Sequence, residues 1–153
     1  LEGCDGRVII ETWIPVVGLV GARVASLSDA ASGRNEQNVP QKKLAKKHNC
    51  TIFVTGETDI ITDGVRVTRV SGGSSFMSNV TAIGCSLTCL VGAFTAITDP
   101  YTASVSAATL FAEAGHKAKL SANGPGSFRM HFIDQLSRVN SHNFSNLKWA
   151  DVV

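Results

Sequence analysis

A single stretch, residues 51–55, constrains the fold more than any other part of the chain. It consists of Thr-Ile-Phe-Val-Thr, and such a β-branched, apolar run without alternation is typical of a strand buried on both faces. A helix is predicted directly before it, with Asn38 as the N-cap, Pro40 in the first turn and His48 at the end. A helix that leads into a buried strand is half of a βαβ unit, so the sequence predicts an α/β fold.

A β-hairpin is predicted after this strand. Residues 60–62 and 65–70 are rich in β-branched side chains and flank Asp63-Gly64, a strong signal for a two-residue turn. A short strand is also expected at residues 8–10. We therefore expect a layered α/β fold with a mostly parallel sheet that includes the buried strand, together with the hairpin and flanking helices.

The rest of the chain is predicted to be mainly helical. Residues 85–96 are almost all apolar or small, which indicates a buried helix of about three turns. Asp99-Pro100 is a helix start, and residues 101–120 continue this helix with many Ala and Ser. Two more helices are expected, one at residues 128–139 and a short C-terminal one that contains Phe144, Leu147 and Trp149.

Composition and charge exclude several classes of protein. The 153 residues are 44% hydrophobic and 17% charged, whereas disordered chains combine low hydrophobicity with high charge. The 14 basic residues exceed the 12 acidic ones by only two, which is too few for nucleic-acid binding through bulk charge. The length suits one domain. No nucleic-acid partner is therefore expected.

Neither a membrane span nor a metal site of Cys and His is expected. No segment reaches the roughly 18 consecutive apolar residues of a membrane span. The acidic Glu2 and Asp5 stand where a signal peptide carries positive charge, so we predict a cytoplasmic protein with reduced thiols. Cys85 and Cys89 are four residues apart, a helical spacing rather than the C-x-x-C of redox and zinc sites, and the four histidines are scattered.

The segment 81–85 carries the clearest chemical signal. It joins a glycine-rich stretch to the predicted helix, whose first N–H groups and dipole would form an anion site. Cys85 falls in the first turn, where a thiolate is favoured, and would act as a base beside a bound phosphate. The alternative interpretation is a structural cysteine buried on an apolar helix, and spacing alone favours that alternative.

Short motifs follow one another between Leu44 and Leu136. They are Val54-Thr55-Gly56-Glu57-Thr58-Asp59, Thr62-Asp63-Gly64, Val80-Thr81-x-x-Gly84-Cys85 and Gly124-Pro125-Gly126-Ser127-Phe128. The same motifs occur in this order in hydroxyethylthiazole kinases, and the chain resembles that family over the whole stretch. Together the motifs are specific, whereas a Gly-Cys pair alone would carry little weight.

The resemblance implies a ribokinase-like α/β fold, present here in part. It also implies an enzyme that transfers the γ-phosphoryl group of ATP to the hydroxyl of hydroxyethylthiazole in thiamine biosynthesis or salvage. Enzymes of this family depend on Mg²⁺ and are commonly trimers with sites at subunit boundaries. ATP and Mg²⁺ are therefore the expected cofactors, a small thiazole alcohol is the expected substrate, and a homo-oligomer is the expected assembly.

The resemblance also assigns roles to four residues. Thr55 matches the threonine that contacts ATP in the family, and Cys85 takes the place of the catalytic Asp of other ribokinase-like enzymes. Ala82 stands at the family's substrate-contacting glycine, and Gly84 remains as a glycine of the ATP-binding anion hole. The β-branched Ile83 is expected to crowd the phosphate and to disfavour a positive φ.

The chain matches only about the C-terminal half of the family. We expect residues 1–37 to be a poorly matched N-terminal segment and residues 38–153 to be the C-terminal part of a ribokinase-like kinase domain. The resemblance assigns no role to Arg7 or Glu11. The residues that would bind Mg²⁺ are therefore unknown. Two alternatives stay open. One is a truncated or degenerate homologue without activity, at most a nucleotide-binding or assembly module, and the other is an unrelated α/β interaction module.

Overall fold

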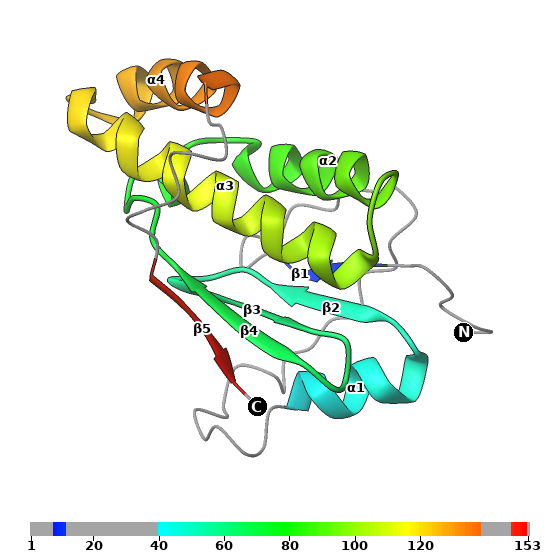
Figure 1. Ribbon diagram of the computed structural model, residues 1–153. Helices are drawn as coiled ribbons and strands as arrows, with labels where there is room; N and C mark the ends of the chain where they lie inside the picture. Colours follow the sequence, from blue (N-terminus) through cyan, green and yellow to red (C-terminus); the bar gives the residue numbers. More distant parts are fainter. Residues whose placement is uncertain (1–7, 12–39, 139–147, 153) are drawn as a thin grey trace.

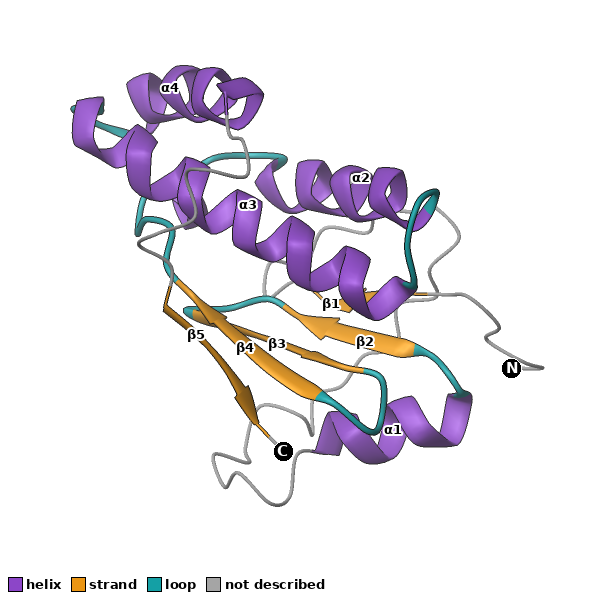
Figure 2. Ribbon diagram, in the orientation of Figure 1, coloured by secondary structure: helices purple, strands orange, loops and turns teal. Residues whose placement is uncertain are grey.

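Figure 1 shows the computed structural model of the chain, which describes residues 8–11, 40–138 and 148–152. In chain order its elements are β1 (Val8–Glu11), α1 (Pro40–His48), β2 (Thr51–Val54), β3 (Thr58–Thr62), β4 (Val67–Ser71), a 3-10 helix (Met77–Asn79), α2 (Ile83–Thr95), α3 (Pro100–Ser121), α4 (Pro125–Arg138) and β5 (Lys148–Val152). The strands form one sheet in the order β1-β2-β3-β4-β5. Helix α1 covers one face of the sheet, and α2, α3 and α4 lie on the other side (Figure 2). The predicted layered α/β architecture is confirmed.

Strand β2 is buried on both faces, as its unbroken apolar run predicts. Ile52 packs with Ala45 of α1 and with Cys50 in one hydrophobic cluster, while Phe53 belongs to the main core, which includes side chains of α2 and α3. Both Ile52 and Phe53 are fully buried. Helix α1 ends at His48, and the parallel pairing of β1 with β2 confirms the βαβ arrangement.

The prediction of a mostly parallel sheet is wrong for the strands that the structure describes. Only β1 and β2 pair in parallel, whereas β2–β3, β3–β4 and β4–β5 are antiparallel pairs. For the pairs β2–β3 and β3–β4 the reason lies in the connections: residues 55–57 link β2 to β3, and residues 63–66 link β3 to β4. Such short links permit only antiparallel pairing, because a parallel neighbour needs a crossover of about a dozen residues or more.

The hairpin between β3 and β4 is confirmed, but its turn is longer than predicted. The Thr62 hydroxyl donates to the Arg66 carbonyl at 2.7 Å and accepts from the Gly64 N–H at 3.1 Å. The Asp63 carboxylate accepts from the N–H groups of Val65 and Arg66 at 2.9 and 2.7 Å. These side-chain hydrogen bonds hold Val65 and Arg66 in the turn, so β4 starts only after them.

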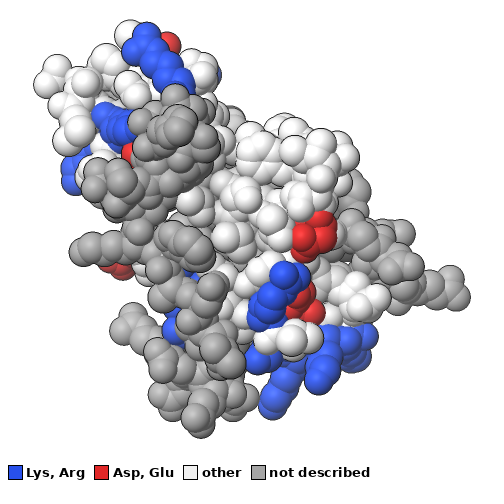
Figure 3. Space-filling model, viewed as in Figure 1, with Lys and Arg blue, Asp and Glu red and all other residues white. Residues whose placement is uncertain are grey.

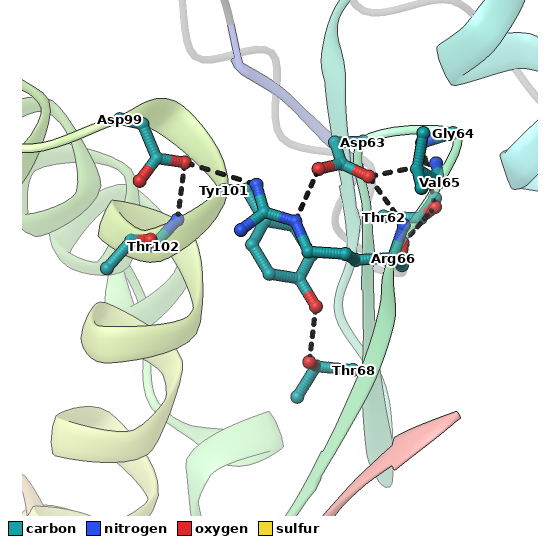
Figure 4. Close-up of polar contacts among 9 residues, drawn as sticks. All are labelled: Thr62, Asp63, Gly64, Val65, Arg66, Thr68, Asp99, Tyr101 and Thr102. Atoms are coloured by element: carbon teal, nitrogen blue, oxygen red, sulfur yellow. Dashed lines mark hydrogen bonds and ion pairs between the residues drawn. The ribbon is translucent and has the colours of Figure 1, made fainter. Parts of the chain in front are cut away.

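Arg66 ties this turn to the start of α3 (Figure 4). Its guanidinium lies 3.9 Å from the centre of the Tyr101 ring, and its Nε lies 2.7 Å from Asp63 Oδ2. Nη2 of Arg66 lies 3.5 Å from Asp99 Oδ1, and the Tyr101 hydroxyl shares a hydrogen bond with the Thr68 hydroxyl. Burial raises the pKa of Asp63, but hydrogen bonds, including those from Arg66, outweigh it and hold the pKa below its usual value. The hairpin is thereby fastened to the helical layer.

Helix α3 begins as the sequence predicts. Asp99 is its N-cap, with a carboxylate that accepts from the Thr102 N–H at 3.2 Å, and Pro100 is the first helical residue. The helix passes close to the glycine-rich loop before α2, because a Cβ added at Gly115 would lie 3.1 Å from the Gly73 Cα. No described helix, α3 included, combines the length and apolar character needed to cross a membrane.

Helix α2 is less buried than predicted. A buried helix is expected at residues 85–96, whereas only Leu87 and Val91 are buried in α2. Both side chains belong to the main core together with side chains of α3. Among the described elements α2 packs mainly against α3. Its other face, which includes Cys85 and Cys89, is therefore exposed.

Helix α4 starts at Pro125, earlier than the predicted residue 128. The Ser127 hydroxyl accepts from the Gly124 N–H at 3.2 Å, which satisfies a backbone donor at the helix start. Phe128 and Phe132 are the buried residues of α4, and their ring centres are 5.7 Å apart. This aromatic pair joins α4 to the main core.

The C-terminal segment contains a strand where the sequence predicts a helix. Trp149 lies in β5, opposite Val70 of β4 in an antiparallel pairing. Without β5, the edge of β4 would present a row of unpaired N–H and C=O groups, and β5 pairs with them. Phe144 and Leu147, which the same prediction included, lie outside the described residues.

Candidate functional site

An open groove of about 480 Å³ runs along α2 and contains two of the four residues predicted for the site. Its lining includes Ala82, Cys85, Ser86, Cys89 and Leu90, together with Leu136 from α4. The exposed surface of this lining is mostly apolar. Such a groove suits an uncharged organic group, because apolar walls favour burial of apolar surface.

Ala82 forms the N-cap of α2 in a left-handed conformation, with φ 69° and ψ 7°. This conformation costs an L-residue with a side chain about 1–2 kcal/mol, a cost that glycine does not bear. The Ala82 carbonyl starts the helix by accepting from the Ser86 N–H at 3.0 Å. The positive φ thus falls on Ala82 and not on Ile83, which is the first helical residue and packs against the core.

The first backbone N–H groups of α2 have no side-chain cap. Ala82 carries no side-chain oxygen and makes no capping hydrogen bond. The N–H groups of the first turn, which include those of Gly84 and Cys85, therefore have no acceptor within the helix. Such N–H groups and the helix dipole favour a negative charge in front of the helix, and the half-buried Gly84 lies in this first turn. The prediction that Cys85 lies in the first turn of a helix is confirmed.

Cys85 is the third residue of α2, and its free thiol is exposed in the groove. The alternative interpretation of Cys85 as a buried structural cysteine is therefore wrong. Cys89, one turn further along, is also an exposed free thiol in the same groove. Among the described residues in the first turn of α2, Cys85 is the one with an ionisable side chain. Its thiol lies where the groove reaches the first N–H groups of the helix.

Thr55 directly follows β2, is half-buried, and does not line the groove. The core nevertheless connects the two places, since Phe53 of β2 and Leu87 of α2 lie in one hydrophobic cluster. In Figure 1 the turn after β2 and the start of α2 both lie toward the left-hand side of their elements. The structure thus brings three of the predicted residues together at the start of α2 and leaves Thr55 just after β2, outside the groove.

Asp59 is a residue of this region that the sequence analysis did not single out. Its carboxylate accepts from the Gly56 N–H at 3.0 Å and so closes the turn that follows Thr55. Burial raises the pKa of Asp59 to about 6, although the hydrogen bond from Gly56 lowers it. The sequence held one signal for the burial of Asp59, the alternation of side chains along a strand. Asp59 stands two residues before the buried Ile61 and therefore on the same face of β3. A carboxyl group with a raised pKa beside a predicted binding residue is a candidate functional group.

The charge distribution separates the groove from the basic surface of the protein. In Figure 3 the surface over α2 is largely uncharged, and basic side chains gather at the lower edge, where α1 lies, and at the upper left, where α4 and the end of α3 lie. Helix α1 carries Lys42, Lys43, Lys46 and Lys47. Among the residues that the structure describes, no Lys or Arg lines the groove. An anion at the start of α2 would therefore depend on backbone N–H groups rather than on lysine side chains.

A family model and two curated proteins match most of the chain. The model of the hydroxyethylthiazole kinase family matches residues 18–142. The hydroxyethylthiazole kinase of Gemmatimonas aurantiaca is 47% identical over 125 residues, which cover 81% of this chain and 45% of the relative. That of Roseobacter denitrificans is 44% identical over 119 residues, which cover 78% of this chain and 44% of the relative. The chain thus spans about half the length of the curated relatives that it matches.

A solved structure is similar in fold. The hydroxyethylthiazole kinase protein from Pyrococcus horikoshii OT3 matches with a TM-score of 0.71 and 36% sequence identity. The match covers 74% of this chain and 45% of that one. The described elements therefore correspond to part of a larger α/β fold.

Proposed function

Because the chain belongs to the hydroxyethylthiazole kinase family, we propose that its protein transfers the γ-phosphoryl group of ATP to the hydroxyl of hydroxyethylthiazole, in thiamine biosynthesis or salvage. The fold is ribokinase-like and α/β, represented here in part. One observation carries the assignment of the site: uncapped N–H groups at the start of α2 meet an apolar groove at the exposed Cys85. The uncapped N–H groups suit a phosphate, and the apolar groove suits an uncharged ring.

We assign the phosphates of ATP to the N-terminus of α2. There the backbone N–H of Gly84 would donate to a phosphate oxygen, and the helix dipole would favour the negative charge. Thr55 is assigned as a hydroxyl that contacts ATP from the end of β2. The hydrogen bond between Gly56 and Asp59 supports this role, because it holds the turn that follows Thr55.

Cys85 is assigned as the catalytic group, and Ala82 as a contact of the thiazole alcohol. The Cys85 thiol is exposed where the groove reaches the start of α2, so a hydroxyl bound in the groove would lie between the thiol and the phosphates. Cys85, as its thiolate, would accept the proton of that hydroxyl while the hydroxyl oxygen bonds to the γ-phosphorus, the bond from the γ-phosphorus to the bridging oxygen breaks and ADP leaves. Phosphoryl transfer gains mainly from positioning and electrostatics, so a weak base is sufficient.

ATP and Mg²⁺ are proposed as the cofactors. Mg²⁺ is usually held by one or two carboxylates together with the phosphates of the nucleotide. In the described part of the chain no three His, Cys, Asp or Glu side chains gather into a metal site. We therefore assign no protein ligand. When bound with ATP, the ion would neutralise charge on the transferred phosphoryl group.

The proposal concerns a whole protein of the family, and this chain spans 45% of the length of its relative from G. aurantiaca. Residues 38–153 would form the C-terminal part of the kinase domain, and residues 1–37 would be a poorly matched N-terminal segment, although β1 pairs with β2 in the same sheet and the family model matches from residue 18. The protein would be cytoplasmic and a homo-oligomer, a trimer by family resemblance, with a thiazole alcohol as its partner rather than nucleic acid or a membrane.

A truncated or degenerate homologue is the second candidate, favoured by Ala82, whose left-handed conformation suits glycine.

A coupled ADP-release assay with ATP, Mg²⁺ and hydroxyethylthiazole tests the proposal. We expect ADP release that depends on the thiazole alcohol and that Cys85→Ser reduces without abolishing it. Cys50→Ala removes a thiol buried away from the groove and is the matched control, which should keep its turnover. Thiazole-dependent release that Cys85→Ala leaves unchanged would show that the site is wrong. No release at all would favour the degenerate homologue.

A further inference from the structure

Two free thiols share one face of α2. Cys85 and Cys89 are four residues apart on the helix, both are exposed, and both line the same open groove. Cys50, the third cysteine within the described residues, is buried in the cluster between α1 and β2. The fold thus separates an accessible pair of thiols from an inaccessible single one.

The helix holds the two thiols too far apart for a direct bond but close enough for a bridge. Cβ atoms of residues four apart on a helix lie about 5–6 Å from each other, whereas a disulfide needs about 3.5–4.5 Å. Cys85 and Cys89 both lie within the continuous helix Ile83–Thr95, so they stay separate thiols as long as it is intact. One atom that bonds both sulfurs would span the remaining gap without unwinding α2.

We propose that Cys85 and Cys89 form a dithiol site that binds trivalent arsenicals of the arsine oxide class. The two thiols replace the oxide oxygen: two As–S bonds form, the As–O bond breaks, and the oxygen leaves as water with the two thiol protons. Arsenic stays trivalent and both sulfurs stay reduced, so the reaction needs no oxidant or reductant. Thiolates are soft ligands and favour soft, thiophilic centres of this kind.

The surroundings of the two thiols suit an arsenical that carries an aromatic ring. The groove has a volume of about 480 Å³ and is bounded by Leu136 of α4 across from α2. Leu90 and Ala93 extend its apolar lining beyond the thiols. A ring on the arsenic would lie against these side chains, and the burial of its apolar surface would add to its retention.

Two attachment points make the site selective over single cysteines. After the first As–S bond forms, the second thiol reacts within the same molecule, and such chelation strengthens binding by about 10²–10⁴-fold. A bridge on Cys85 would also block the thiol to which we assign catalysis. The inference itself does not depend on kinase activity, because binding is measured directly as added mass.

The test uses the 153-residue chain and phenylarsine oxide. Intact mass spectrometry under non-denaturing conditions gives the stoichiometry, and challenge with excess monothiol and then with 2,3-dimercaptopropanol gives the retention. We expect one phenylarsenic per chain, which resists the monothiol and is removed by the dithiol. Cys85→Ser and Cys89→Ser should each weaken retention by at least about 100-fold, while Cys50→Ala and Cys4→Ser keep it.

Undiminished retention in the Cys85→Ser or Cys89→Ser variant would overturn the proposal, because one thiol would then be sufficient. Loss of retention in Cys50→Ala or Cys4→Ser, with helix content unchanged by circular dichroism, would also overturn it, because another pair would then be the ligand. Leu136→Ala tests the position of the ring and should weaken the retention of phenylarsine oxide more than that of arsenite. Equal weakening of both would overturn the placement of the ring in the groove.

Discussion

The carboxylate of Asp59 accepts a hydrogen bond from the backbone N–H of Gly56 at 3.0 Å. This bond spans the turn between β2 and β3, directly after Thr55. Burial raises the pKa of Asp59 from 3.8 to about 6, and the bond from Gly56 only partly opposes the rise. The turn beside a proposed ATP contact is therefore closed by a carboxyl group whose charged form the fold disfavours.

Asp59 should make the stability of the protein depend on pH. Its folded pKa lies above the unfolded value, so its contribution to stability is fully present below about pH 4 and is lost as the pH rises through about 6. Asp59→Asn removes the charge and keeps an oxygen acceptor for Gly56. In urea unfolding we expect the variant to gain about 2 kcal/mol at about pH 7.5 and much less at about pH 4.

Glu57→Gln is the matched control for this pH dependence, because Glu57 lies in the same turn and is exposed. Its effect on the free energy of unfolding should stay within about 0.5 kcal/mol at both pH values. An Asp59→Asn variant that shifts stability equally at the two pH values would contradict the raised pKa of Asp59.

Ala82→Gly should stabilise the protein. The left-handed conformation costs alanine about 1–2 kcal/mol, and the greater freedom of glycine in the unfolded chain cancels part of that gain. We expect a net increase of about 0.5–1 kcal/mol in the free energy of unfolding. Ala93→Gly, at an exposed position in regular α2, is the control and should lose about 1 kcal/mol. A loss of stability in both variants would argue against strain at Ala82.

Gly64→Ala should destabilise the hairpin turn. Gly64 has φ 91°, and a Cβ there would lie 2.8 Å from the backbone nitrogen of Lys46 in α1. The combined backbone strain and clash should cost about 2 kcal/mol, seen as a lower Tm in calorimetry. Gly92→Ala is the matched control in α2, where the added Cβ meets no atom within 4 Å, and it should gain up to about 1 kcal/mol. Equal Tm values for the two variants would refute the close approach of the turn to α1.

Thr55→Ala should weaken ATP binding if Thr55 donates its hydroxyl to the nucleotide. The loss of one hydrogen bond to a charged group corresponds to about 1–1.5 kcal/mol, or roughly a five- to tenfold higher Kd in a calorimetric titration. Thr55→Ser keeps the hydroxyl and should restore most of the affinity. Thr95→Ala removes a hydroxyl that donates to the Gly92 carbonyl at the far end of α2 and serves as the control. If the Thr55→Ala variant binds ATP as tightly as the unmodified protein, the assignment of Thr55 as an ATP contact is wrong.

The sequence alone determined the elements that rest on local signals. The helix before β2, the unbroken apolar run of β2 and the start of α3 at Asp99-Pro100 were all predictable. Helical hydrogen bonds and caps join residues only a few positions apart, so their signals lie in one short stretch of sequence. The position of Cys85 in the first turn of a helix was predictable for the same reason.

Only the tertiary structure decided how those elements pair and which side chains they cover. Trp149 lies in a strand because the distant edge of β4 is there to pair with it. Cys85 is exposed because α2 packs mainly against α3 among the described elements. The raised pKa of Asp59 likewise depends on burial between elements. Each of these outcomes depends on contacts between residues far apart in the sequence, and the free energy of such contacts is not encoded in any local pattern.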